Sequence, residues 1–177
     1  MGMLMQLTDP SGAVNRFEYN KVGQRTAVID AAGQRTVFSY DPAGRMIQRK
    51  DPQGNIDQYE YDPMGMLMRT VDASGQEIQY QYDALGYLTS QTAVGSGGMN
   101  GDSRFYSYDA AGHLVQASNV SGSYQFTYDA ADRLSSQQFT NSGLSTNNTL
   151  YFTYDPAGRL TQVRDNLNAR LSCATKP

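Results

Sequence analysis

The sequence is poor in residues that build chemical sites, because its 177 residues contain no tryptophan, one cysteine and one histidine. The single cysteine, Cys173, excludes an intrachain disulfide. The single histidine, His113, argues against a histidine-rich metal site and against a Ser-His-Asp triad. Glycine-rich phosphate-binding motifs and the acidic loops that bind calcium are also missing. These absences predict a protein that is not an enzyme, with no catalytic, cofactor-binding or metal-binding residues.

Long apolar runs and a strong charge bias are missing as well. No apolar run approaches the roughly 20 residues needed to cross a bilayer, so we expect no membrane span. The first residues lack the basic and long apolar regions of a signal peptide. The net charge of −3 gives no electrostatic reason to expect a nucleic-acid partner.

The chain does contain an internal repeat with a period near 21 residues. A Tyr-Asp pair recurs six times, Tyr19-Asn20 is a degenerate first copy, and a glycine follows most of the Asp residues three positions later. The predicted structural motif comprises Tyr40, Asp41, Gly44, Tyr61, Asp62, Gly65, Tyr82, Asp83, Gly86, Tyr108, Asp109, Gly112, Tyr128, Asp129, Tyr154, Asp155 and Gly158. A second Asp-x-x-Gly segment lies midway in the early repeats, at residues 9–12, 30–33, 51–54 and 72–75. Each repeat therefore consists of two half-units, each closed by a turn.

The Asp-x-x-Gly segments have the residues that a tight turn requires. An Asp carboxylate accepts a hydrogen bond from the backbone two residues on, and Gly supplies the positive φ at the last position. The six or seven residues left between turns match one ordinary strand. A short helix would also fit that length, so the side-chain pattern has to decide.

The aromatic residues favour strands over helices. An aromatic residue lies two positions before each repeat tyrosine, as in Phe38/Tyr40 and Tyr59/Tyr61. The chain has nineteen aromatic residues, 13 Tyr and 6 Phe, and fourteen of them belong to seven such pairs. A spacing of two places both rings on one face of a strand but on different sides of a helix. Because short loops join neighbouring antiparallel strands, we predict an all-β antiparallel meander of tandem β-hairpins that forms a long twisted ribbon. The aromatic pairs should lie beside the Leu or Met that begins the next strand.

The position after the turn glycine is variable. His113 follows Gly112, and the corresponding positions in other copies hold Arg45, Met66, Tyr87 and Arg159. We interpret this as a rim position, and we predict no catalytic role for His113.

The repeat has breaks and limits. Two repeats are longer by five residues, at about 95–101 and 141–148, and we expect both loops at the same edge of the sheet. The periodic pattern fades after about Asp165, which divides the chain into a repeat array over 1–165 and an unpatterned tail over 166–177. Residues 1–12 align with residues 64–75, so the chain begins in mid-repeat. Because neither end has a convincing cap, we expect a fragment of a longer array.

Four of the repeat segments carry a family resemblance. Residues 40–46, 82–88, 108–114 and 154–160 resemble the YD repeats of the rearrangement-hotspot (Rhs) family, which includes bacterial polymorphic toxins, components of insecticidal toxin complexes and animal teneurins. The resemblance implies a β-ribbon that forms a hollow shell around a C-terminal toxin domain, in a secreted or cell-surface-associated bacterial protein. The motif that ends such a shell before the toxin is missing here, so no toxic activity is implied for this chain.

Two hypotheses follow. The first is a non-catalytic segment of an Rhs-type shell, whose partners are further YD repeats and an enclosed toxin domain. The second is a carbohydrate- or cell-surface-binding repeat module that uses the aromatic stripe to bind glycans.

Overall fold

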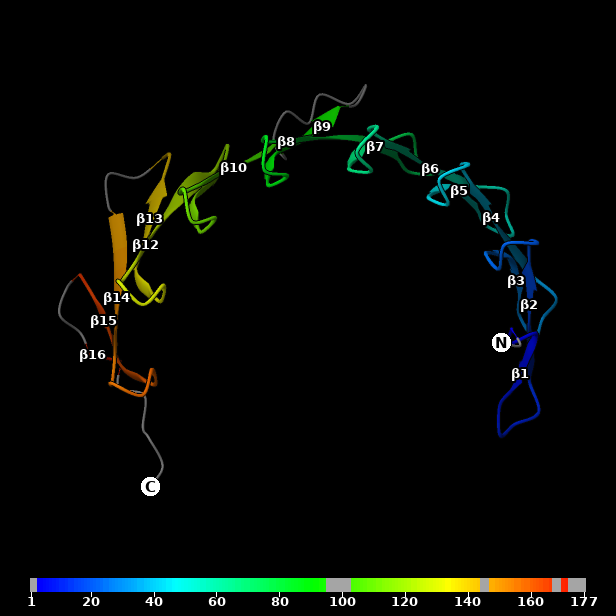
Figure 1. Cartoon of the computed structure of the whole chain (residues 1–177), viewed down its shortest axis with the longest axis horizontal. Helices are drawn as coiled ribbons and strands as arrows, with labels where there is room; N and C mark the ends of the chain where they lie inside the picture. Colours follow the sequence, from blue (N-terminus) through cyan, green and yellow to red (C-terminus); the bar gives the residue numbers. More distant parts are fainter. Residues whose placement is uncertain (1–2, 95–102, 144–146, 167–169, 172–177) are drawn as a thin grey trace. The chain divides into compact units, whose positions relative to one another are not determined.

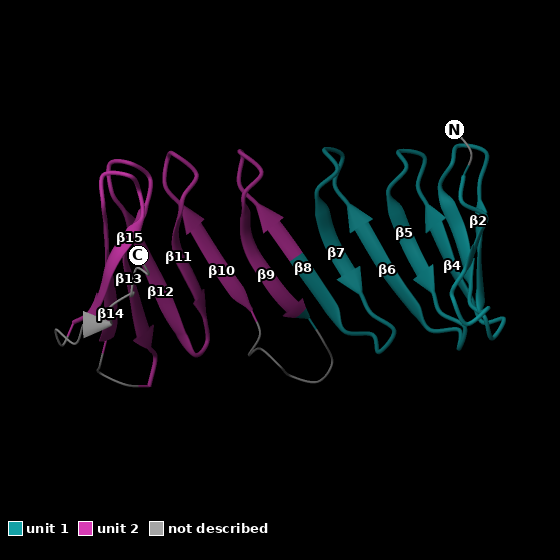
Figure 2. Ribbon diagram, turned by 90° about the horizontal axis from the view of Figure 1, so that it is seen from below, with its two compact units in different colours: residues 1–79, 94–97 teal, residues 80–93, 98–177 magenta. Residues whose placement is uncertain are grey.

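The structure is a computed structural model that describes residues 3–94, 103–143, 147–166 and 170–171. The described part of the chain is all-β, with strands and turns and no helix. It divides into two compact units, residues 1–79 with 94–97 and residues 80–93 with 98–177 (Figure 2).

In both units each strand pairs with the strand that follows it in the sequence, and the pairs given for the described residues are antiparallel (Figure 1). Unit 1 contains β1 (Gln6–Thr8), β2 (Val14–Tyr19), β3 (Arg25–Ile29), β4 (Arg35–Tyr40), β5 (Met46–Lys50), β6 (Ile56–Tyr61), β7 (Leu67–Val71) and the first half of β8 (Glu77–Tyr82). Unit 2 contains the rest of β8, nearly all of β9 (Leu88–Val94), β10 (Arg104–Tyr108), β11 (Leu114–Asn119), β12 (Gly122–Tyr128), β13 (Leu134–Asn141), β14 (Asn147–Tyr154), β15 (Leu160–Asp165) and β16 (Arg170–Leu171). The prediction of an all-β antiparallel meander is confirmed.

The Asp-x-x-Gly segments form hydrogen-bonded turns, as the repeat that begins at Asp109 shows. The Gly112 N–H donates to the Asp109 carbonyl at 3.0 Å, and the Asp109 N–H donates to the His113 carbonyl at 3.0 Å. The Asp109 carboxylate accepts N–H groups from Ala111 and His113, each at 2.9 Å. Gly112 has φ of 88°, a conformation that costs most other residues free energy. The acceptance of the N–H four residues on was not foreseen, and it ties the turn to the residue that directly precedes the next strand.

Among the strand pairs whose register is described, only the Tyr-Asp hairpins contain a β-bulge. In the β12–β13 hairpin, Thr127 is opposite Ser136 and Tyr128 is opposite Leu134, so that Ser135 has no partner residue. The same shift occurs in the β2–β3, β4–β5, β6–β7, β10–β11 and β14–β15 hairpins. The mid-repeat hairpins keep an unbroken register. In each unit the Tyr-Asp turns lie along one edge of the sheet and the mid-repeat turns along the opposite edge (Figure 2).

The register places the aromatic pairs of each unit on one face. In unit 1, Phe17 is opposite Val28 and Val28 is opposite Thr36, which lies on the same side of β4 as Phe38. Tyr40 is opposite Met46, so the predicted pairing of the repeat tyrosine with the following Leu or Met is confirmed. One ion pair, Arg49 with Asp57 at 2.8 Å, lies on the aromatic face, and further ion pairs lie on the other face. There Arg69 binds Glu60 at 2.6 Å and Glu77 at 2.8 Å.

The described residues do not enclose a hydrophobic core. Ala27 is their only fully buried apolar residue, and none of their large side chains is fully buried. The repeat rings are therefore half-buried on a single-layered sheet. A closed core would require a second layer of secondary structure to cover this face of the sheet.

Three further expectations concern the two longer loops, the C-terminal segment and the absence of a membrane span. Residues 95–102 and 144–146, which carry most of the two longer loops, lie outside the described residues. Arg170–Leu171 forms β16 and pairs with β15, within the segment expected to be an unpatterned tail. The domain boundary at residue 165 stays a prediction. Among the described residues there is no helix of the length and apolarity that a bilayer span requires.

Two turn glycines give a matched test of the turn geometry. Gly158 has φ of 81° and open space where a Cβ would stand, whereas a Cβ at Gly112 would collide with the phenol of Tyr87. We expect Gly158→Ala to lower the free energy of unfolding by about 1–2 kcal/mol, the cost of a left-handed backbone. Gly112→Ala should cost roughly 1–3 kcal/mol more through the added clash. Urea unfolding measures both, and equal losses would contradict the close approach of Tyr87.

Candidate functional site

Side chains join neighbouring repeats along the edge of each unit that carries the Tyr-Asp turns. The backbone hydrogen-bond ladder between successive repeats ends before it reaches this edge. Between β11 and β12 the last backbone pair toward the edge is Gln116 with Gln125, and Tyr128 lies three residues beyond it. The Tyr128 hydroxyl donates a hydrogen bond to the Leu114 carbonyl at 2.9 Å and so bridges the strands where their backbones no longer pair.

This tyrosine bond, which we call the phenol latch, recurs in both units. It is one hydrogen bond from a repeat tyrosine to a carbonyl at the start of the second strand of the preceding Tyr-Asp hairpin. The described pairs are Tyr19 with Leu4, Tyr40 with Arg25, Tyr61 with Met46, Tyr108 with Leu88, Tyr128 with Leu114, and Tyr154 with Leu134, at 2.8–3.1 Å. Each latch therefore joins one repeat to the next.

The residue after the turn glycine, which we call the post-turn residue, contacts the tyrosine of the next repeat. The Arg45 guanidinium carbon lies 4.9 Å from the centre of the Tyr61 ring, and that of Arg133 lies 4.6 Å from the centre of the Tyr154 ring. Such cation–π contacts contribute roughly 0.5–1 kcal/mol at exposed sites. Tyr87 stacks on Tyr108 with 4.9 Å between ring centres.

An arginine at the post-turn position also binds both of the turns that it joins. The Nε atom of Arg45 donates to the Asp41 carboxylate of its own turn at 2.7 Å. Its Nη1 atom donates to the Asp62 carbonyl of the next turn at 2.8 Å. The planar guanidinium has enough donors to make both bonds while its face covers the Tyr61 ring. This geometry accounts for the arginine at two post-turn positions, Arg45 and Arg133.

His113 takes the place of this arginine in its own repeat. Its ring stacks on Tyr128 with 4.6 Å between centres, and its Nδ1 atom lies 3.0 Å from the Asp109 carboxylate. Its Nε2 atom lies 3.6 Å from the carboxylate of Asp132, which occupies the glycine position with φ of 58°. The interpretation as a rim position misses this contact, because the His113 side chain is only 23% exposed and joins two repeats, whereas Arg159 at the corresponding position is 78% exposed.

Three of the turn carboxylates have a lowered pKa, which favours their ionised form. The side-chain hydrogen bond from Arg133 is the largest cause that lowers the pKa of Asp129, and the hydrogen bond from His113 acts in the same way on the pKa of Asp109. For Asp155 the backbone N–H of Arg159 is the main cause of the lowered pKa. A lowered pKa means that the charged carboxylate contributes to stability. The described residues contain no group of three or more side chains suited to holding a metal ion.

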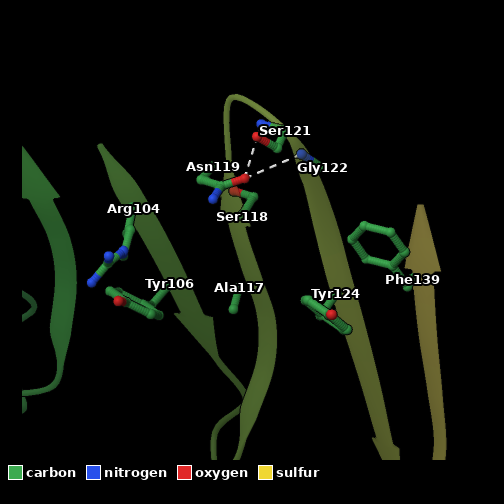
Figure 3. Close-up of a pocket in the computed structure, with 9 residues that line it drawn as sticks. All are labelled: Arg104, Tyr106, Ala117, Ser118, Asn119, Ser121, Gly122, Tyr124 and Phe139. Carbon is green, nitrogen blue, oxygen red and sulfur yellow. Dashed lines mark hydrogen bonds between the residues drawn. The ribbon is translucent and has the colours of Figure 1, made fainter. Parts of the chain in front are cut away.

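Unit 2 also has a hollow on its aromatic face, over the small side chain of Ala117 (Figure 3). Its volume is about 410 Å³. Tyr106 on β10 and Tyr124 on β12 flank Ala117 on β11 in one lateral row of the sheet. Phe139 continues the row on β13, and Arg104 lies at the rim. We call this feature the Ala117 hollow.

Two features of the sequence indicate the latch and the stacking contact beside it. The first ring of each aromatic pair is Phe or Tyr, but the second ring is Tyr in all seven copies. The restriction to tyrosine indicates that the hydroxyl group makes a structural hydrogen bond. The post-turn residues were likewise long or cyclic side chains rather than a random polar mixture, which is typical of a stacking position.

Comparisons with known proteins point to one family. The family model described as "Teneurin YD-shell" matches residues 3–172. Two solved structures share the fold, the crystal structure of TcdB2-TccC3-TEV and that of TcdB2-TccC3 without its hypervariable C-terminal region. Their TM-scores are 0.76 and 0.72, with 19% and 17% identity over 95% and 90% of this chain. The chain spans only 10% and 9% of their lengths. No curated protein matches it significantly.

The phenol latch predicts a specific cost for removing one oxygen atom. We expect Tyr128→Phe to lower the free energy of unfolding by about 1–2 kcal/mol, because the Leu114 carbonyl loses its donor. Amide hydrogen exchange should accelerate first in β11 and β12. Tyr151→Phe is the matched control, since its hydroxyl has no hydrogen bond among the described residues. Equal effects of the two substitutions would refute the latch.

The ion pairs predict loss of stability in acid. The hydrogen bond from Arg69 lowers the pKa of Glu77 to about 2. A lowered pKa in the folded state adds stability above the unfolded value, about 4.3 for Glu, and this stability disappears as pH falls through the folded value. Urea unfolding should therefore become easier between about pH 4 and pH 2, and Glu77→Gln should flatten this dependence. An unchanged slope in the variant would contradict the assignment.

Proposed function

The chain belongs to the teneurin YD-shell family, and on that premise we propose that it is a non-catalytic wall segment of a protein shell. The observation that carries this proposal is the repeated contact between neighbouring repeats at the Tyr-Asp edge. Within each unit phenol latches join one repeat to the next, and four post-turn residues add contacts to the following tyrosine, in the nearest-neighbour manner of repeat proteins. This arrangement can be extended by further repeats without changing any single contact.

The open aromatic face is a second argument for a wall. A sheet whose large side chains are only half-buried has one face available for whatever lies against it. We propose that further YD repeats continue the sheet and that the assembled shell encloses a toxin domain. A secreted or cell-surface-associated protein follows from the same proposal, because toxins that act on other cells have to leave the producing cell.

Glycan binding along the whole aromatic stripe is less well supported by the contacts. The post-turn residues already cover one face of four repeat tyrosines, namely Tyr61, Tyr108, Tyr128 and Tyr154. A ring that stacks on a protein side chain offers less of its surface to a sugar. We therefore propose that the stripe is structural, and that any ligand binds where the repeat pattern is interrupted.

A chimera tests the wall function directly. The stretch of TcdB2-TccC3 that superposes on this chain is replaced by residues 3–172. If the chain is a wall segment, electron microscopy should show a closed shell like that of the parent, and its contents should resist added protease as in the parent. The matched control carries Gly44→Val and Gly158→Val, which disrupt two turns. An open or protease-permeable particle from the unmodified chimera, with the parent closed, would contradict the proposal.

A further inference from the structure

The Ala117 hollow is a local departure from the repeat. The residue opposite the first ring of each aromatic pair is elsewhere larger, being Val28, Arg49, Thr70, Gln137 or Val163 in the other described hairpins. Only opposite Tyr106 is it alanine. The sheet surface is therefore lowered at Ala117, in a row where a larger side chain fills the space in sister repeats.

Tyr124 is the second departure, on the other side of Ala117. The corresponding positions hold Thr36, Asp57, Ile78 and Leu150 in the sister repeats. Tyr124 is thus an additional ring that the repeat motif does not require, and it is 40% exposed. Two tyrosine rings stand on either side of the alanine as a result (Figure 3).

Both rings are held in place before any ligand arrives. The Tyr106 hydroxyl donates a hydrogen bond to Oε1 of Gln91 at 3.3 Å. The Tyr124 ring packs against Phe139, with 4.7 Å between ring centres. Fixed side chains lose little conformational entropy on binding, which favours affinity.

The polar groups at the hollow are available as donors. Arg104 is exposed, and within the described residues its guanidinium makes no ion pair or side-chain hydrogen bond. The Asn119 side-chain oxygen accepts N–H groups from Ser121 and Gly122, at 2.9 and 3.2 Å (Figure 3). Its amide N–H₂ group remains as a donor at the hollow. A cation and a neutral donor beside two rings favour an anionic ligand that also has a stacking surface.

The spacing of the rings selects the kind of ligand. Tyr106 and Tyr124 are on strands two apart, which are separated by roughly 10 Å. Figure 3 draws both rings nearly edge-on, at the two sides of the hollow rather than face to face across it. A single sugar ring, with C–H groups on its faces and hydroxyl groups at its rim, can lie flat over the Ala117 methyl group between them. The volume of about 410 Å³ lies in the usual range for small-ligand sites, about 300–1,000 Å³.

We propose that the Ala117 hollow binds one carboxylate-bearing sugar ring, a sialic or uronic acid residue of an acidic glycan. The ring lies over Ala117 between Tyr106 and Tyr124. Its carboxylate pairs with the Arg104 guanidinium, which suits planar carboxylates through two parallel hydrogen bonds. The Asn119 amide donates to a hydroxyl oxygen. This site does not depend on the shell function, because it uses side chains that the latches leave free.

The experiment is a titration of the 177-residue chain with sialyllactose and with a hyaluronan tetrasaccharide, followed by calorimetry and by NMR. Lactose serves as the neutral counterpart. We expect saturable binding of at least one acidic saccharide, with affinity at least roughly tenfold above that for lactose, as a charge-assisted contact implies. Perturbed resonances should cluster on Tyr106, Ala117 and Tyr124.

Three variants locate the site. Arg104→Gln should weaken acidic binding roughly tenfold and bring it to the level of lactose. Ala117→Gln and Tyr124→Thr introduce residues that sister repeats already carry at these places, so the fold tolerates them, and each should abolish detectable binding. The matched controls are Arg164→Gln and Tyr151→Leu, which remove a cation and an exposed ring elsewhere in unit 2 and should leave affinity unchanged.

Several outcomes would overturn the proposal. These are no saturable binding of either acidic saccharide, equal affinity for lactose, or unchanged binding in Arg104→Gln. Binding that persists in both Ala117→Gln and Tyr124→Thr would place the sugar elsewhere. Circular dichroism of each variant separates lost binding from lost folding, and Arg104→Gln alone decides the matter if the other two unfold.

Discussion

The structure of each unit depends on the contact between consecutive repeats at the Tyr-Asp edge. The β-bulge in every described Tyr-Asp hairpin shifts the register at the repeat tyrosine, and the backbone ladder to the neighbouring repeat ends before it reaches this edge. Carbonyl groups there would lack a protein donor without the tyrosine hydroxyl. The post-turn side chain then packs against the same ring, as Arg133 does on Tyr154. At Tyr154 the hydrogen bond, the stacking contact and the turn geometry therefore act at one place.

This arrangement replaces a hydrophobic core with a periodic set of partly exposed contacts. Among the described residues only Ala27 is a fully buried apolar residue, so stability cannot come mainly from enclosed side chains. Each repeat instead contributes similar small terms, which add along the sequence. The opposite face adds ion pairs such as that of Arg69 with Glu60 and Glu77, which bridge three adjacent strands. A sheet of this kind suits a wall, where one face meets further material.

The sequence predicted the fold well because two independent periods agreed. The spacing of two within the aromatic pairs indicated strands, and the Asp-x-x-Gly segments marked their ends, so topology and strand pairing followed. The phenol latch was not predicted, because it depends on the β-bulge of the Tyr-Asp hairpin. In the β12–β13 hairpin the bulged residue is Ser135 and not a glycine, so the sequence does not mark the bulge. The role of His113 was misjudged for a related reason. Variation at a position suggested exposure, whereas Arg, Tyr and His all stack on a ring. The Ala117 hollow depends on residues from four strands and becomes visible only when their register is known.

A double-mutant cycle between Arg133 and Tyr154 tests the central claim most directly. The two residues belong to consecutive repeats, and 4.6 Å separates the guanidinium carbon from the ring centre. The free energies of unfolding are measured for the original chain, Arg133→Met, Tyr154→Leu and the double variant. Contact across the edge predicts a coupling energy of about 0.5–1 kcal/mol in favour of the original pair. Strictly additive losses would mean that consecutive repeats are not joined at this edge, and would contradict the account.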